Sequence, residues 1–153
     1  MKNILASAIA LLAAGSLAAS ASAASLSPGD GAFTGAGVFT LTKGSLTLTC
    51  TLNLTGHITG GIGTVDTATF TGSGGLCSLI SKAGAWTVTA TGAGTATITG
   101  FAITSPIIGT CGPGSVNTTI SNSGLITFAN ATLPPNCQIS GSVQTSPPVT
   151  VVP

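Results

Sequence analysis

The side chains that could carry out chemistry are few and lie far apart along the 153-residue chain. His57, Asp30 and Asp66 are the candidates for acid–base catalysis. A Ser-His-Asp triad needs a serine on a sharp turn, and the sequence contains no Gly-x-Ser-x-Gly motif that would supply it. The histidine stands between a glycine and an isoleucine, which favours an exposed or strand-end imidazole over a catalytic base.

Paired carboxylates and phosphate-binding loops are equally poorly supported. Asp30 lies in a Ser-Pro-Gly-Asp-Gly turn sequence and Asp66 in a strand-like segment, so a structural role is the better interpretation of each. Lys43 before Gly44 is typical of a hairpin tip, and Lys82 of a loop. The glycine-rich segments lack the lysine and helix start that bind phosphate. We therefore assign no catalytic residue and no cofactor, and we expect the protein not to be an enzyme.

Charge is nearly absent from the chain, because three lysines and two aspartates are its only ionic side chains. Nucleic acid is excluded as a partner, since phosphate binding needs clustered lysine and arginine. The neutral surface offers little electrostatic protection from self-association.

The first 23 residues are typical of an export signal. Lys2 precedes an apolar run from Ile4 to Leu17, and a small-residue triplet at 21–23 forms the cleavage site. The apolar run is too short for a membrane span of about 20 residues, and we expect no transmembrane anchor after cleavage. The mature chain would then be residues 24–153, a single domain that passes through the periplasm to the cell surface or the medium.

Apolar residues alternate with threonine in four segments, which we expect to form the strands that position the charged and titratable side chains. The period of two covers residues 38–42, 46–52, 86–91 and 95–99 and predicts strands with one apolar face and one threonine face. Glycine and proline pairs at 60–61, 74–75, 113–114 and 134–135 predict turns. Residues 149–153 are expected to form a last strand that closes the sheet, or alternatively an edge available to another subunit.

An internal repeat of 57 to 63 residues relates residues 32–88 to residues 89–153. Two similar halves predict an all-β antiparallel sandwich or barrel of roughly eight to ten strands, preceded by a signal-peptide helix. Four cysteines allow three connectivities, and the repeat favours the pairs Cys50–Cys77 and Cys111–Cys137 as structural disulfides. A zinc site is disfavoured because the chain has one histidine and no Cys-x-x-Cys pair.

Several motifs together resemble one bacterial family. They are Gly109-Thr110-Cys111-Gly112-Pro113-Gly114, the proline-rich approach to Cys137 and the closing segment 146–153. Across essentially the whole mature chain, the sequence resembles the Pra-type protein activators of alkane oxidation. The resemblance implies a small secreted protein linked to growth on long-chain alkanes and, in some members, to the biofilm matrix as an adhesin.

Three hypotheses follow, in order of preference. The first is a non-enzymatic protein that acts on hydrocarbon or another hydrophobic surface, since burying hydroxyls costs far less than burying charges. The second is a biofilm matrix adhesin or self-assembling subunit. The third is a carrier of a small hydrophobic ligand, because barrels of about eight strands are able to hold one.

Overall fold

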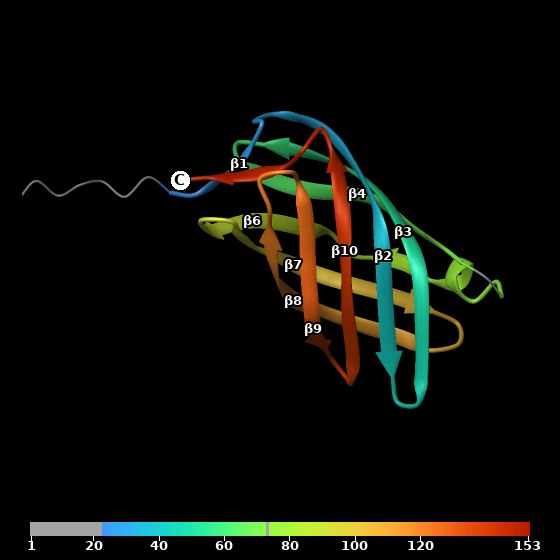
Figure 1. Ribbon diagram of the computed structural model, residues 1–153. Helices are drawn as coiled ribbons and strands as arrows, with labels where there is room; N and C mark the ends of the chain where they lie inside the picture. Colours follow the sequence, from blue (N-terminus) through green and yellow to red (C-terminus); the bar gives the residue numbers. More distant parts are fainter. Residues whose placement is uncertain (1–22, 73) are drawn as a thin grey trace, which may run out of the picture.

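A computed structural model describes residues 23–72 and 74–153 of the chain (Figure 1). These residues form eleven strands and one short 3-10 helix, η1, and the expected signal-peptide helix lies outside them. The elements are β1 (Ser25–Ser27), β2 (Gly31–Lys43), β3 (Leu46–Thr59), β4 (Ile62–Thr71), η1 (Cys77–Leu79), β5 (Ser81–Ala83), β6 (Trp86–Gly92), β7 (Thr95–Ser105), β8 (Gly109–Ile120), β9 (Leu125–Leu133), β10 (Cys137–Ser146) and β11 (Thr150–Val152).

Eight of the strands close into an antiparallel barrel. Each of β2, β3, β4, β6, β7, β8, β9 and β10 pairs with the next, and β10 pairs with β2 to complete the ring. The short strand β5 lies between β4 and β7. In Figure 1 the strands β2, β3, β9 and β10 on one side of the barrel cross the direction of β6 and β7 on the other. The predicted all-β class and strand number are confirmed.

The threonine–apolar alternation produces the two sides of the barrel wall. Phe39 and Leu41 are fully buried inside, whereas Thr40 and Thr42, which alternate with them along β2, face outward. Aromatic rings fill the interior, with the ring centroids of Trp86 and Phe101 4.1 Å apart in a stacked arrangement. Since threonine is β-branched, the outer face keeps strand propensity without needing charge.

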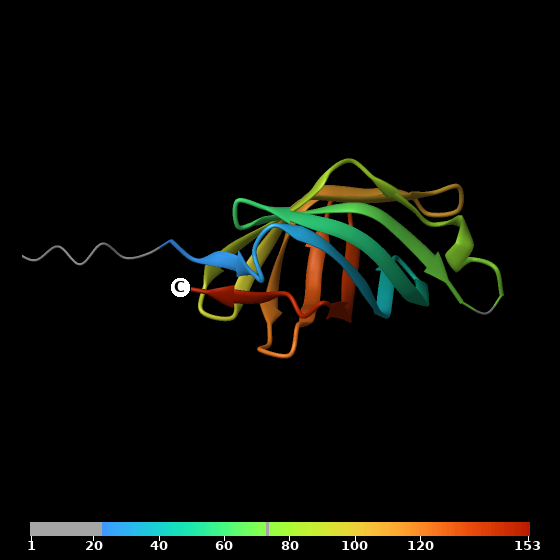
Figure 2. The same ribbon diagram turned by 90° about the horizontal axis from the view of Figure 1, so that it is seen from above.

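The two ends of the domain meet in a separate two-stranded ribbon. Strand β11 pairs only with β1, in the register Ser25↔Val152 to Ser27↔Thr150. Figure 2 shows this ribbon at one end of the barrel. The expectation that the last strand closes the main sheet is therefore wrong, since β10 closes it by pairing with β2.

Two further local predictions are wrong. Pro113 and Gly114 lie inside β8 rather than in a turn, because the irregular pairing of β7 with β8 gives Pro113 no partner in the register. Lys82 lies in strand β5, where it pairs with Ile103 of β7, and not in a loop.

The strands β4 and β9 share an irregularity. In both, the sequence of buried and exposed positions is the same over nine residues, Ile62–Phe70 and Leu125–Leu133. Both also contain a bulge, which lies at Asp66 in β4 and at Ala129 and Asn130 in β9. The two segments are 63 residues apart, an offset within the range of the sequence repeat. The duplication itself stays a prediction.

Candidate functional site

The structure brings together His57 and Asp66, two of the three side chains that the sequence offered for acid–base chemistry. His57 Nδ1 lies 2.9 Å from Asp66 Oδ2, and the bulge at Asp66 aims both that residue and Thr67 outward. The side chains are 46% and 47% exposed and lie on the convex outside of the barrel wall. An exposed contact of this kind between a histidine and a carboxylate contributes between 0 and about 1 kcal/mol to folding.

The other charged side chains have structural partners. The Asp30 carboxylate accepts a hydrogen bond from the Gly60 backbone N–H at 2.7 Å, which ties the start of β2 to the β3–β4 turn. Lys43 Nζ donates to the Ile108 carbonyl oxygen at 2.6 Å and so joins the β2–β3 hairpin tip to the β7–β8 turn. The two aspartates that a glycosidase pair would require therefore engage different partners.

The ammonium group of Lys82 is held near the barrel wall. It donates to the Gly84 carbonyl oxygen at 2.6 Å and lies 5.6 Å from the centre of the Trp86 ring. Within residues 23–72 and 74–153, no group of three or more histidine, cysteine, aspartate or glutamate side chains is placed to hold a metal ion.

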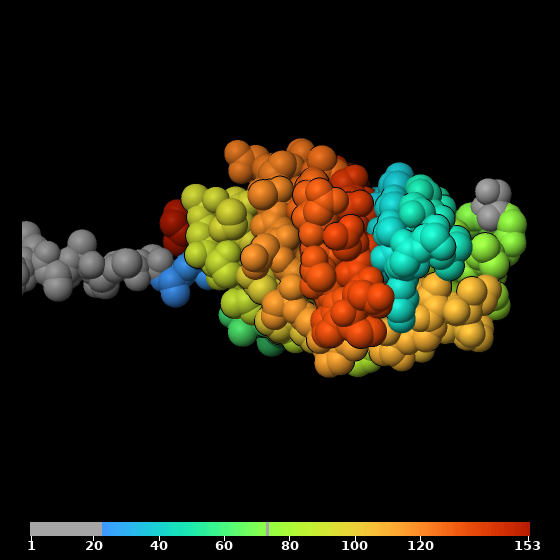
Figure 3. Space-filling view, turned by 90° about the horizontal axis from the view of Figure 1, so that it is seen from below, coloured from blue at the N-terminus to red at the C-terminus, as the bar shows by residue number. Residues whose placement is uncertain are grey.

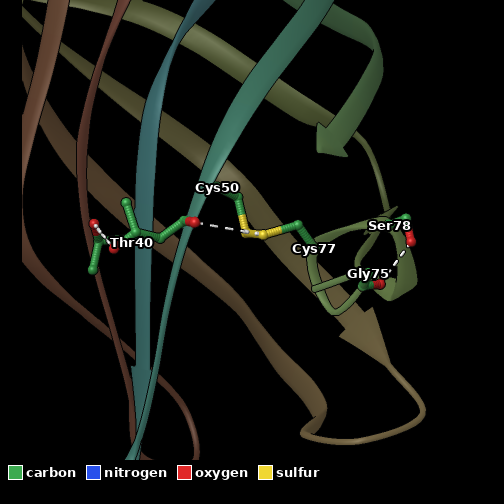
Figure 4. The surroundings of a disulfide bond; sticks show 6 residues. Thr40, Cys50, Gly75, Cys77 and Ser78 are labelled. Carbon is green, nitrogen blue, oxygen red and sulfur yellow. Dashed lines mark hydrogen bonds between the residues drawn. A yellow bond between two sulfur atoms is a disulfide. The ribbon is translucent and has the colours of Figure 1, made fainter. Parts of the chain in front are cut away.

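The four cysteines pair as the repeat predicts. Cys50 of β3 is bonded to Cys77 of η1, and Cys111 of β8 is bonded to Cys137 of β10, with Cα–Cα distances of 5.7 and 5.8 Å. Figure 4 shows the first bond, in which the loop that carries η1 is fastened to the side of β3. Disulfides are typical of proteins that mature in an oxidising compartment.

The barrel interior is packed rather than hollow. The cavity inside has a volume of about 30 Å³ and is lined only by apolar side chains. Ligand pockets usually measure about 300–1,000 Å³, so this space admits about one water-sized group. The interior therefore offers no ready site for a small-ligand carrier.

Threonine hydroxyls form hydrogen-bonded pairs over the outer face. The hydroxyl oxygens of Thr55 and Thr67 lie 2.7 Å apart, and those of Thr42 and Thr47 lie 3.1 Å apart. Cross-strand pairs of this kind stabilise the sheet. They also satisfy part of the hydrogen bonding of the threonine hydroxyls, which water would otherwise have to satisfy. The outer face is thus polar, carries few charges, and satisfies part of its own hydrogen bonding.

Three exposed aliphatic side chains occupy the barrel end that lies opposite the terminal ribbon. We call Leu76, Leu79 and Ile107, which are 37%, 41% and 52% exposed, the aliphatic end. Leu76 and Leu79 flank Cys77, whereas Ile107 lies in the β7–β8 turn. The pairing of Ser81 with Thr104 brings the two segments to the same end, and Figure 3 shows them there side by side. This cluster is the candidate site for contact with an apolar phase.

Sequence reasoning did not identify the aliphatic end. Its signal is local: leucine and isoleucine occur in two segments that break the threonine alternation, at 75–79 and 105–109, and each segment contains a glycine or a proline. The two segments come to the same end of the barrel only when β5 pairs with β7, and that pairing leaves no mark in the sequence.

Comparison with known proteins gives one match. The model of the family described as "Alkane oxidation protein activator PraA/PraB-like" matches residues 1–153. No curated protein and no solved structure matches the chain. Within the described part of the chain, no helix has the length and apolar character needed to cross a membrane.

Proposed function

Because the chain belongs to the PraA/PraB-like family of alkane oxidation protein activators, we propose that it is a secreted, non-enzymatic protein that contacts hydrocarbon directly. It acts at the cell surface or at the oil–water interface, and it assists alkane uptake or oxidation by bringing cells and hydrocarbon together. The observation that carries the proposal is the aliphatic end on a barrel that carries almost no charge.

The neutral surface supports adsorption to oil. Residues 24–153 contain two lysines and two aspartates, so a molecule that approaches hydrocarbon has few charges to dehydrate. Dehydrating a hydroxyl costs much less than dehydrating an ion, and the threonine pairs already satisfy part of their own hydrogen bonds.

The aliphatic end supplies a favourable free energy for adsorption. Full burial of one leucine or isoleucine side chain is worth about 1.5–3 kcal/mol, and each of the three side chains still exposes between a third and a half of its surface. Entry of all three into oil is therefore worth about 3 kcal/mol, which raises the partition coefficient roughly a hundredfold.

The experiment measures pendant-drop tension of a hexadecane–water interface against concentration of the oxidised mature protein. The test variant replaces Leu76, Leu79 and Ile107 by serine. The control variant replaces Val38, Ile62 and Leu125 by serine; these residues are 52%, 46% and 37% exposed, so the two variants lose nearly equal exposed aliphatic surface. Light scattering on the same samples checks that each protein stays monomeric.

We expect the wild-type protein and the control variant to lower the tension, and the test variant to need a much higher concentration for the same effect. If wild-type protein lowers the tension no more than a generic globular protein, the proposal fails. If the two variants lower the tension equally, the aliphatic end is not the part of the protein that contacts hydrocarbon.

The terminal ribbon favours a second candidate function, that of a self-assembling matrix subunit or adhesin. Strand β11 has one strand neighbour, β1, so its other edge is unpaired within the described residues, and Val152 is 39% exposed. An unpaired edge without charge is able to accept a strand from another copy.

A single charged substitution tests assembly at this edge. Val152→Lys introduces charge at an exposed position of β11 and leaves the buried Val149 in place. If edge pairing drives assembly, light scattering will show growth of wild-type assemblies and little growth of the variant. Equal growth of both would refute this route.

A further inference from the structure

A polar groove lies on the barrel wall between β4 and the segment that carries η1 and β5. Its volume is about 470 Å³, and it is a surface groove open to solvent rather than an enclosed pocket. Side chains of both polar and apolar character line it, namely Asp66, Thr67, Ala68, Thr69, Phe70, Ser78, Ile80, Ser81 and Lys82.

The groove lies where one edge of β4 lacks a paired strand. On this edge, β4 pairs with β6 through Ile62–Val65 and with β5 only at Thr69. Residues 66–68 have no strand partner on that side, so backbone polar groups of β4 face the groove. The bulge at Asp66 lies in the same stretch and turns its carboxylate outward.

Charge gathers at this groove on a molecule that has almost none elsewhere. Of the five charged or titratable side chains between residues 24 and 153, cysteines aside, Asp66 and Lys82 line the groove and His57 binds Asp66. The contacts of Asp66 with His57 and of Lys82 with the Gly84 carbonyl oxygen hold these two side chains of opposite charge beside the groove.

We propose that the groove binds a neutral polysaccharide chain. A carboxylate accepts hydrogen bonds from sugar hydroxyls, an ammonium group donates to them, and the Ser78 and Ser81 hydroxyls do both. Phe70 and Ile80 lie beneath the groove and are only 3% and 4% exposed, so the accessible surface of the groove is mainly polar and suits the hydroxyl groups of a sugar. The carboxylate repels strongly anionic polymers and the ammonium group repels strongly cationic ones, so a groove that holds both favours a neutral polymer.

Isothermal titration of the oxidised mature protein tests the groove with soluble neutral oligosaccharides, namely maltoheptaose, cellohexaose and mannohexaose, and with an oligoguluronate as the anionic comparison. The groove variants are Asp66→Asn and Lys82→Gln. The matched controls are Asp30→Asn and Lys43→Gln, which make the same charge changes at residues that do not line the groove. Far-ultraviolet circular dichroism checks that every variant is folded.

We expect saturable binding of at least one neutral oligosaccharide, weakened about tenfold or more by each groove substitution and unchanged by the controls, since a hydrogen bond to a charged group contributes about 1.5–3 kcal/mol. The proposal is overturned if no neutral oligosaccharide binds, if the oligoguluronate binds more tightly than all of them, or if the groove variants bind as the wild type does. The groove variants keep all three side chains of the aliphatic end, so pendant-drop tension reports separately on contact with hydrocarbon.

Discussion

Removal of the two disulfides one at a time tests how the barrel is held together. The variants are Cys50→Ala with Cys77→Ala, and Cys111→Ala with Cys137→Ala. The bonded cysteines are separated by 27 and 26 residues, so the loops that they close are almost the same length. In the chain-entropy treatment each closed loop contributes about 3.5 kcal/mol by restricting the unfolded chain.

The two variants should lose different amounts of stability, because the folded structure relaxes differently around each missing disulfide. Cys77 lies on a 3-10 turn that is joined to the barrel by its flanking segments, and this turn is able to shift into the space left by the sulfur atoms. Cys111 and Cys137 lie on two strands of the closed ring and are fully buried, so their surroundings relax less. Because the cost of a cavity depends on how far the site collapses, the second variant should lose about 1 kcal/mol more.

Urea unfolding followed by Trp86 fluorescence measures both losses, since this ring is buried and stacked on Phe101. We expect a loss of about 3.5 kcal/mol for the first variant and a larger one for the second, with melting temperatures lower by at least about 10 °C. A loss below about 1 kcal/mol in either variant, or a larger loss in the first, would refute the reasoning.

Three further substitutions probe the wall and the core. Gly141→Ala should destabilise the barrel by at least about 2 kcal/mol in urea unfolding, because a Cβ atom there would collide with the backbone oxygen of Val38 on the paired strand. Trp86→Phe should cost about 2 kcal/mol or more in calorimetry, since the indole N–H donates to two carbonyl oxygens that would lose this partner; an unchanged melting temperature would contradict this. His57→Gln should change the unfolding free energy by less than about 1 kcal/mol, because its ion pair with Asp66 is exposed; a loss above 2 kcal/mol would contradict that assignment.

Features with a local cause could be predicted from the sequence. Alternation of threonine with apolar residues predicted strands because a period of two places Phe39 and Leu41 on one face whichever strands lie beside them. The cysteine pairs followed from the repeat, since equivalent positions in two copies favour equivalent bonds.

Features that depend on pairing between distant strands could not be predicted. Pro113 suggested a turn because the sequence does not reveal that an irregular stretch of β8 leaves its position without a ladder partner. The groove beside Asp66 arises where β4 lacks a partner between its contacts with β6 and β5, and a gap in pairing has no signature in residue types. The contact between His57 and Asp66 could not be predicted, because the bulge that turns Asp66 outward depends on how β3 pairs with β4.

The meeting of the first and last strands determines when this chain is able to finish folding. Strand β1 pairs with β11, and β2 pairs with β10, so the contacts that close the ring join residues more than 90 positions apart. Such long-range pairing forms late and slowly, because the loop-closure entropy must be overcome first. A chain that is synthesised from its N-terminus holds β2 with an open edge until β10 is present. Completion of the barrel is therefore a late step, and until then the unpaired edge of β2 is open to pairing with another chain.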